Sequence, residues 1–349
     1  MKIKSEDLFD RVQELLLAAG ENPNNAKIVA ESLVKADARG VSTHGTYLLT
    51  PIFDRVKVGQ LALPTTASLV IDEAAVAVVD GGNGLGPVAG NLAIETSIQR
   101  ARTYGISMVL IRNTNNLGSL AFYTEKIASQ GMIAMMSCNA APAMAPWGGA
   151  EAFTGTNPIA ISIYTGSEML FSADMATSVV ARGKIRQASR EGKAIPADWA
   201  LDADGNPTTD PAAALKGTLL PMAGPKGSAL ALAVDIMSGI LAGAEHAPNL
   251  KSFHAPEGKT GVGGALVTVD ISKFMPLSEF KDTMVEYIKS LKAMKKAKSA
   301  TEIFLPGEIE HNRENASHEA GITLDDKAVA VLNQLLEKIG STQRLEAIV

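Results

Sequence analysis

Cysteine and aromatic residues are scarce in this sequence of 349 residues, which contains one cysteine, Cys138, and 5% aromatic residues. A single cysteine excludes a disulfide-linked scaffold and a cysteine-rich metal site. An excess of charge of one sign is also lacking, because 32 basic and 37 acidic residues leave a net charge of −5. This balance gives no support to a nucleic acid as a partner.

Long apolar runs are absent as well. No apolar stretch reaches the roughly 18 residues that a membrane-spanning helix needs. The nearest one, residues 226–244, is interrupted by Lys226 and Asp235. The N-terminus turns acidic where a signal peptide would need an apolar segment. No membrane partner is therefore expected, and a cytoplasmic location is expected by default.

Apolar residues nevertheless make up 46% of the chain and charged residues 20%, with 31 glycines. This composition excludes a disordered chain, which would be poor in aliphatic residues and strongly charged. At roughly 150 residues per domain, the length predicts about two domains. A chain of this size can bury about three quarters of its unfolded surface, which is enough for a substantial core.

Both ends of the chain carry helical patterns. We predict helices there over residues 5–20, 26–39, 43–59, 278–298, 309–320 and 325–339. Ser5 is placed to cap the first helix, whose apolar residues share one face: Leu8, Val12, Leu15 and Leu16. A turn at 22–25 precedes the second helix, and Pro51 either kinks or restarts the third.

The middle of the chain alternates strands with helices. Predicted strands cover residues 67–71, 75–79, 106–111, 132–137, 159–164, 169–171 and 266–271. Predicted helices cover residues 87–105, 119–130, 177–192 and 227–244, with a short one after 208–211. The order favours an α+β fold in which helical ends flank a mixed α/β middle.

A glycine-rich segment at 81–86 follows a predicted strand and opens a predicted helix, as a dinucleotide fingerprint does. The spacing fails, because Pro87 stands where the last glycine of that fingerprint belongs, and no acidic residue follows about 20 residues later. A structural turn is the favoured interpretation. A phosphate-binding P-loop is absent too, because Phe253 replaces the first glycine of the motif that would end at 258–260.

Metal chemistry finds little support. Among the five histidines, His311 and His318 could share a helix face, but two histidines without a third carboxylate ligand hold zinc poorly. A surface pair is the favoured interpretation, and no metal site is predicted. Cys138 has no base nearby in the sequence and is predicted to be buried rather than nucleophilic.

His44 is the candidate acid–base residue. It lies in the segment 39–45 at a predicted helix start, where the helix dipole disfavours the cationic imidazole and lowers its pKa. Such a ring can exchange a proton near neutral pH. The hydroxyl of Thr43 can cap the helix or orient the ring. A histidine that only caps or donates a hydrogen bond remains the alternative.

Several loops suit a close backbone approach to an anion, because each pairs glycine with proline or a hydrogen-bonding side chain. They lie at 148–149, 155–158, 224–227 and 306–308. Lys226, at a predicted helix start, would add a charge and free N–H groups for a phosphate. Each loop taken alone is also explained by an ordinary turn.

Together these segments resemble the second type of malate/L-lactate dehydrogenases, a family distinct from the Rossmann lactate dehydrogenases. It includes ureidoglycolate dehydrogenase, sulfolactate dehydrogenase, 2,3-diketogulonate reductase and piperideine-2-carboxylate reductase. The matching segments stand in family order, at 36–40, 43–45, 80–86, 113–118, 145–149, 155–158, 174–177, 181–184, 196–200, 208–211, 225–227 and 306–308.

The resemblance implies a fold and a reaction. The fold would combine a helical domain built from residues 1–66 and 273–349 with a non-Rossmann cofactor domain, residues 67–272, that holds a mixed sheet. The reaction would transfer a hydride between NADH or NADPH and a small 2-oxo or 2-hydroxy acid, or a cyclic imine. A homodimer with its active site near the subunit interface would be usual for the family.

The resemblance also assigns roles. His44 matches the proton donor, Thr43 the residue that orients or relays its proton, and Asn116 a further catalytic position. The cofactor-contacting positions would be Leu117, Gly118, Gly155, Thr156, Asp174, Met175, Ala176, Lys184, Pro225, Lys226, Pro306, Gly307 and Glu308. Positions beside the substrate would be Leu48, Asn139 and again Thr156.

Two residues depart from the family's pattern. Asn116 stands where a second histidine is common, and an amide cannot titrate, so the proton transfer falls to His44 alone. Leu48 stands where many members carry an arginine suited to a carboxylate. Both changes make the pocket less cationic and argue against a doubly polar substrate. A family member that binds the cofactor without catalysis is the alternative, and a nucleotide-dependent ligase or kinase is a weaker one.

Overall fold

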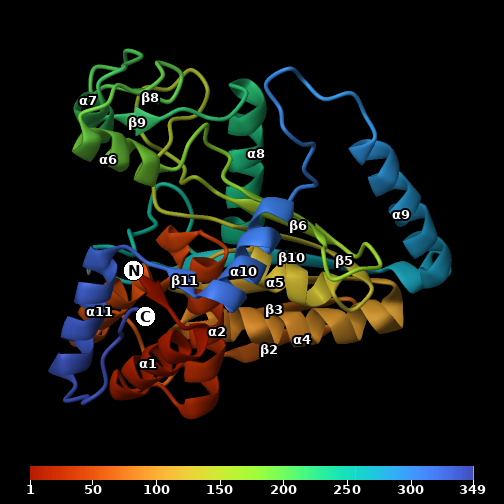
Figure 1. Ribbon diagram of the computed structural model, residues 1–349, viewed down its shortest axis with the longest axis horizontal. Helices are drawn as coiled ribbons and strands as arrows, with labels where there is room; N and C mark the ends of the chain where they lie inside the picture. Colours follow the sequence, from red (N-terminus) through yellow and green to blue (C-terminus); the bar gives the residue numbers. More distant parts are fainter. Residues whose placement is uncertain (256, 349) are drawn as a thin grey trace.

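The computed structural model describes residues 1–255 and 257–348 (Figure 1). A seven-stranded sheet crosses the molecule in the spatial order β2-β3-β4-β10-β5-β6-β7. Its strands are β2 (Ser68–Glu73), β3 (Val76–Gly84), β4 (Ile106–Thr114), β5 (Met132–Cys138), β6 (Ile159–Ile163), β7 (Phe171–Met175) and β10 (Val262–Asp270). Only the β3–β4 pair is parallel within this sheet. The predicted mixed sheet is confirmed, and it differs from the parallel sheet of a Rossmann fold.

Two helices, α4 (Gly86–Tyr104) and α5 (Ala121–Ala128), cover one face of the sheet. Their apolar residues join Val109, Met136 and Leu266 from three strands in one buried core. Helix α4 has Pro87 in its first turn and ends at Gly105, whose φ of 86° suits glycine. A turn was predicted for the glycine-rich segment 81–86. The segment is a turn only in part, because β3 continues through it to Gly84.

The opposite face of the sheet is only partly covered. Helix α8 (Pro225–Asp235) passes into a π-helical turn, η3 (Ile236–Ile240), that contacts β10 and β4. The predicted single helix over 227–244 is therefore wrong in its second half. Beyond this cover the face is open to solvent. Val76, Ile106 and Met135 are 48%, 48% and 47% exposed.

Both ends of the chain share a second core. It gathers apolar residues of α1 (Ser5–Ala18), α2 (Pro23–Ala38), α3 (Leu49–Lys57) and α11 (Asp326–Lys338). The first and last segments also pair as short antiparallel strands, β1 (Lys2–Ile3) and β11 (Ile322–Thr323). The predicted apolar face of the first helix is confirmed, because Leu8, Val12, Leu15 and Leu16 are buried.

Two cap residues and one proline explain how three of the terminal helices begin. Lys4 is the N-cap of α1, so Ser5 lies inside the helix and forms no side-chain cap. Asn22 caps α2 by accepting a hydrogen bond of 3.0 Å from Asn25 N, so the helix already begins at Pro23 where a turn was predicted. Pro51 lies in the first turn of α3, which makes it a restart rather than a kink.

A third, smaller cluster forms beside the large sheet. It contains α6 (Arg182–Glu191), α7 (Pro211–Lys216) and a two-stranded sheet of β8 (Ala200–Leu201) and β9 (Thr218–Leu219). Their apolar residues pack around Met144. Helix α6 begins at Arg182 rather than at 177, because Thr177 and Ser178 pair with residues 221–222 instead.

Two helices lie in the C-terminal part before α11. Helix α10 (Glu308–Ala320) packs on α2. Helix α9 (Leu277–Lys292) lies to one side of the other terminal helices, buries none of its side chains in this chain, and contacts α10 through Lys292 and Glu308 at their ends (Figure 1). Helix α9 belongs to the predicted helical domain by its residue numbers, but none of its residues joins the core that α1, α2, α3 and α11 share. The division into residues 1–66 with 273–349 and 67–272 stays a prediction.

Candidate active site

His44 ends a short 3₁₀ turn, η1 (Ser42–His44), whose backbone closes with a hydrogen bond of 2.9 Å from His44 N to Val41 O. The ring is therefore not at a helix N-terminus, and the predicted dipole effect on it is wrong. The direction of the pKa shift is nevertheless as predicted. Burial lowers the pKa of His44, and the negative charge of Asp174 partly opposes that shift.

The ring of His44 contacts its neighbour as the sequence suggested. Thr43 Oγ1 lies 3.0 Å from His44 Nδ1. Because this contact engages Nδ1, the other nitrogen, Nε2, remains for proton exchange with a substrate. The alternative in which Thr43 caps a helix is wrong, since no side-chain cap is present at this turn.

The buried carboxylate of Asp37 fixes the segment that follows His44. Asp37 Oδ2 accepts hydrogen bonds of 2.8 Å from Thr46 N and 2.7 Å from Thr46 Oγ1. Gly45 passes so close to Asp37 that any Cβ there would clash with the carboxylate. Burial raises the pKa of Asp37 to about 6, although the bonds from Thr46 act in the opposite direction.

Asp174 links the His44 turn to the start of α5. Its Oδ2 accepts hydrogen bonds of 2.9 Å from both Ser119 Oγ and Ala121 N. The preceding loop is shaped by Asn116, whose Oδ1 accepts a bond of 2.7 Å from Gly118 N. The amide NH₂ of Asn116 has no hydrogen-bond partner within the described chain, so it can donate to a ligand.

Two predicted loops meet at the end of β7, and a third lies near its start. Thr177 donates to Thr156 O from its backbone N at 2.8 Å and from Oγ1 at 2.9 Å. Thr177 O in turn accepts 2.9 Å from Met222 N, which brings the start of α8 alongside. Near the start of β7, Ser172 N donates to Pro306 O at 2.9 Å. Segments around 156, 174–177 and 222–226 are thereby held together, and the segment around 306 is held at the other end of β7.

Glycines allow close backbone packing in the loops at both ends of β7. A Cβ at Gly155 would clash with Ala140 O, and one at Gly307, whose φ is +88°, would lie 2.8 Å from Ser172 O. Lys184 and Lys226 are exposed and form no ion pair among the described residues. Narrow backbone turns next to two available cations fit an extended ligand with phosphate groups.

Four predicted residues do not offer their side chains to this site. Leu48 and Leu117 are 4% and 2% exposed and pack in apolar cores. Asn139 uses both ends of its amide on backbone groups, donating 2.8 Å to Glu245 O and accepting 2.9 Å from Gly263 N. Within this chain these side chains therefore have structural roles, and the predicted substrate contacts of Leu48 and Asn139 stay predictions.

Glu308 is the fourth of these residues. Its carboxylate contacts Lys292 Nζ at 2.6 Å and accepts a bond of 2.7 Å from Leu305 N. Burial opposes ionisation of Glu308, but these partners lower its pKa overall. Because both partners belong to this chain, the Glu308 side chain shapes the 306–308 turn rather than reaching a ligand.

The structure adds residues that the sequence did not reveal. The ring of His254 lies 5.8 Å from that of Tyr47, three residues after His44. Burial lowers the pKa of His254, and the charges of Arg186 and His44 lower it further. The sequence holds no signal for this neighbourhood, because the three segments are far apart along the chain and no spacing motif connects them.

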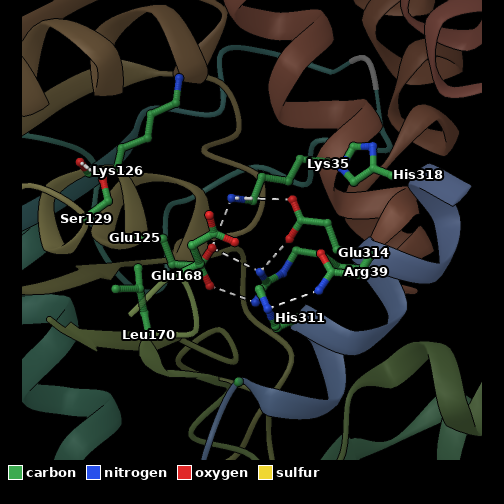
Figure 2. A pocket seen from close by; sticks show the side chains of 12 residues that line it. Lys35, Arg39, Glu125, Lys126, Ser129, Glu168, Leu170, His311, Glu314 and His318 are labelled. Atoms are coloured by element: carbon green, nitrogen blue, oxygen red, sulfur yellow. Dashed lines mark hydrogen bonds and ion pairs between the residues drawn. The ribbon is translucent and has the colours of Figure 1, made fainter. Parts of the chain in front are cut away.

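A cavity of about 280 Å³ lies beside this region, between α2, α5 and α10 (Figure 2). Arg39 lies between Glu125, at 2.7 Å, and Glu314, at 3.0 Å. Lys35 contacts the same two glutamates at 3.1 and 3.7 Å. The main charges that line the cavity therefore form ion pairs with one another. These ion pairs connect the three helices, so the cavity is not the candidate active site.

Other classes of site find no support within residues 1–255 and 257–348. No group of three metal-ligating side chains gathers there. None of the described helices has the length and apolarity to cross a membrane. Cys138 is buried as predicted, and burial raises the pKa of its thiol to about 12.

Fold and site together define a class: a mixed α/β protein with a histidine beside a junction of glycine-containing loops. A profile of the malate/L-lactate dehydrogenase family matches residues 3–333. L-sulfolactate dehydrogenase of Methanocaldococcus jannaschii is 37% identical over 340 residues, covering 97% of this chain and 98% of the relative. A solved sulfolactate dehydrogenase from that organism has a TM-score of 0.92 and covers 98% of both chains.

Two further relatives carry cofactor names. Ureidoglycolate dehydrogenase (NAD(+)) of Escherichia coli is 30% identical over 327 residues, which is 93% of each chain. (2R)-3-sulfolactate dehydrogenase (NADP(+)) of Chromohalobacter salexigens is 34% identical over 276 residues, covering 79% of this chain and 81% of the relative. The chain thus belongs to the malate/L-lactate dehydrogenase family, and the resemblance seen in its motifs is confirmed.

Proposed function

We propose that this chain is an oxidoreductase that interconverts a small 2-hydroxy acid and its 2-oxo acid with NAD or NADP as cofactor. The observation that carries the proposal is the placement of His44. The turn that carries it contacts the first turn of α6, where a Cβ at Gly183 would lie 3.5 Å from Thr43 Cγ2; burial lowers the pKa of His44, and the charge of Asp174 opposes that shift. Relatives named sulfolactate and ureidoglycolate dehydrogenases support the substrate class.

His44 supplies the acid–base chemistry in this proposal. Reduction of a carbonyl leaves negative charge on its oxygen, and a nearby acid must donate a proton to it. Thr43 holds Nδ1 at 3.0 Å, so Nε2 exchanges that proton. Asp174 supports the cationic ring before the proton leaves. In the oxidative direction the same nitrogen accepts the proton of the alcohol.

The loops at the two ends of β7 form the proposed cofactor site. When bound, the nicotinamide cofactor supplies or accepts the hydride. Gly155 and Gly307 let the 155–158 and 306–308 turns pack closely against Ala140 and Ser172, and Lys184 and Lys226 offer charge to the phosphate groups of the cofactor. The names of the relatives include both NAD(+) and NADP(+), so the proposal extends to either cofactor.

The proposal is tested by binding and turnover with the full chain. NADH and NADPH are titrated separately by fluorescence, and the tighter one is then assayed with pyruvate, oxaloacetate, 3-sulfopyruvate and piperideine-2-carboxylate. Oxidation of the cofactor with a 2-oxo acid is the expected result. Turnover of the cyclic imine alone would replace the proposed substrate class, and cofactor binding without any turnover would leave a non-catalytic family member.

We also propose a homodimer. Val76, Ile106 and Met135 expose apolar side chains on the open face of the sheet, and Tyr287 on α9 is 62% exposed. Apolar surface of this kind is typical of a face that another chain covers. A second copy of this chain is the occupant that family membership favours.

A further inference from the structure

The acid group of the substrate has no assigned partner yet. This question rests on the proposed function, because every 2-oxo acid carries a carboxylate beside the reacting carbonyl. A carboxylate that leaves water needs a charged donor. Position 48, close to His44 in the chain, is a leucine with 4% exposure, so no cation comes from there.

The loop that begins at Phe253 brings a histidine to the His44 turn. Beyond the 5.8 Å between the rings of His254 and Tyr47, the ring of Phe253 lies 6.0 Å from that of His254. The imidazole of His254 therefore lies beside two aromatic rings, one of which belongs to the residue three positions after His44.

A buried arginine fixes this loop. Arg55 is fully buried and donates 2.9 Å to Ala255 O and 2.9 Å to Gly258 O. Its Nε donates 3.1 Å to Asn115 Oδ1, and its guanidinium lies 5.7 Å from the centre of the Phe253 ring. The position of His254 is therefore set by a cation inside the protein rather than by the loop alone.

Helix α6 brings a second donor to the same place. Gly183 in its first turn faces Thr43, since a Cβ there would lie 3.5 Å from Thr43 Cγ2. Arg186 follows three residues later on the same side of the helix. Its positive charge lowers the pKa of His254, in addition to the larger effect of burial. Arg186 is exposed and forms no ion pair with any residue of the described chain.

We propose that Arg186 and His254 bind the carboxylate of the substrate beside His44. Arg186 supplies the positive charge and a planar pair of N–H donors that matches a carboxylate. His254 adds a single N–H donor and narrows the direction from which the acid enters. Arg186 is thereby a determinant of specificity for 2-oxo acids over neutral ketones.

The test compares two substrates in two variants. The 2-oxo acid that the unmodified enzyme reduces best is assayed beside its neutral amide, which has the same carbonyl without the charge. In Arg186→Gln, kcat/KM for the acid is expected to fall about 10- to 100-fold, mainly through KM, while that for the amide stays within about 2-fold. Arg186→Lys is expected to recover part of the loss.

Matched controls separate binding from folding. Arg190→Gln makes the same change one turn further along α6 and is expected to leave both substrates unaffected. His254→Gln is expected to raise KM for the acid by about 2- to 10-fold at unchanged kcat. Binding of oxamate, an unreactive carboxylate probe, to the NADH- or NADPH-loaded enzyme is expected to weaken in parallel in Arg186→Gln.

The outcomes also separate the two proposals. If the unmodified enzyme is active and Arg186→Gln keeps the ratio between acid and amide, the inference about Arg186 and His254 is wrong and the proposed function stands. An equal loss for acid and amide would likewise overturn it in favour of a structural role. If the unmodified enzyme reduces no 2-oxo acid and binds no oxamate, the proposed function itself fails.

Discussion

At the scale of single residues, the proposed chemistry depends on a histidine whose surroundings lower its pKa. Burial disfavours the charged ring of His44, and Asp174 limits that effect. A ring balanced in this way can both donate and accept a proton near neutral pH. Its Nδ1 is already engaged by Thr43, so one nitrogen is committed to orientation and the other to proton exchange.

Replacing His44 tests this role directly. His44→Ala is expected to lower turnover by roughly 10²- to 10⁴-fold, because the proton donor is lost, while cofactor affinity is largely kept. Steady-state assays give the first quantity and fluorescence titration gives the second. His318→Ala, an exposed histidine on α10, is the control. Unchanged turnover in His44→Ala would remove the residue from the mechanism.

Asp37 gives the protein a pH-dependent stability. Its pKa rises from 3.8 to about 6 on folding, so the folded protein holds this proton more tightly than the unfolded chain does. The corresponding stabilisation is present below pH 3.8 and is lost as the pH rises through about 6. The difference corresponds to up to about 3 kcal/mol.

Asp37→Asn is expected to abolish this dependence. The free energy of unfolding of the variant, relative to the parent, is expected to rise by up to about 3 kcal/mol between low and neutral pH. Urea unfolding at a series of pH values measures it. Asp7→Asn, at an exposed position of α1, is the control and is expected to follow the parent curve. If the free energy of unfolding of Asp37→Asn changed with pH in the same way as that of the parent, the pKa of the Asp37 carboxyl group would be the same in the folded and unfolded states.

At the scale of elements, a buried ion cluster holds together the helices around the site. Arg39 joins α2 to Glu125 on α5 and Glu314 on α10 (Figure 2). Helix α2 leads into the His44 turn, α5 starts beside Asp174, and α10 starts at the 306–308 turn. A relative shift of these helices would therefore move parts of the site against each other.

Removing the arginine is expected to destabilise the protein strongly. Arg39→Met leaves two glutamates without their main partner inside the protein, which costs about 3–5 kcal/mol. Arg11→Met breaks a pair with Glu14 on α1 that is more exposed, and is expected to cost about 0.5 kcal/mol or less. Chemical denaturation compares the two variants. Equal losses of unfolding free energy in the two variants would show that the buried ion pairs of Arg39 stabilise the protein no more than the more exposed pair of Arg11.

Most helices and strands were predictable, and the differences have local causes. The apolar period of α1 and the proline and glycine that bound α4 are signals within one segment. The late start of α6 is different, because Thr177 and Ser178 pair with residues more than forty positions away. The π-helical end of α8 likewise depends on the sheet beneath it.

At the scale of the whole molecule, the proposed homodimer would be formed through the open face of the sheet. Met135, on β5, is exposed on this face. Met135→Glu is expected to convert a dimer into a monomer, because a charge would be buried between two apolar surfaces. Light scattering after size exclusion measures the mass. Leu17→Glu, an exposed leucine on α1, is the control and is expected to leave the mass unchanged. A monomeric parent protein would contradict the proposal at once.

The sequence by itself determined the family, the mixed α/β order of elements and the candidates His44 and Thr43, because each depends on residues close together in the chain. Only the tertiary structure decided which candidates face one site. Asn139 and Glu308 are loop residues in the sequence, yet their side chains are used by the protein itself. Arg186 and His254 have no shared motif, and long-range packing brings them to His44. Such contacts depend on the whole fold, and no local pattern encodes them.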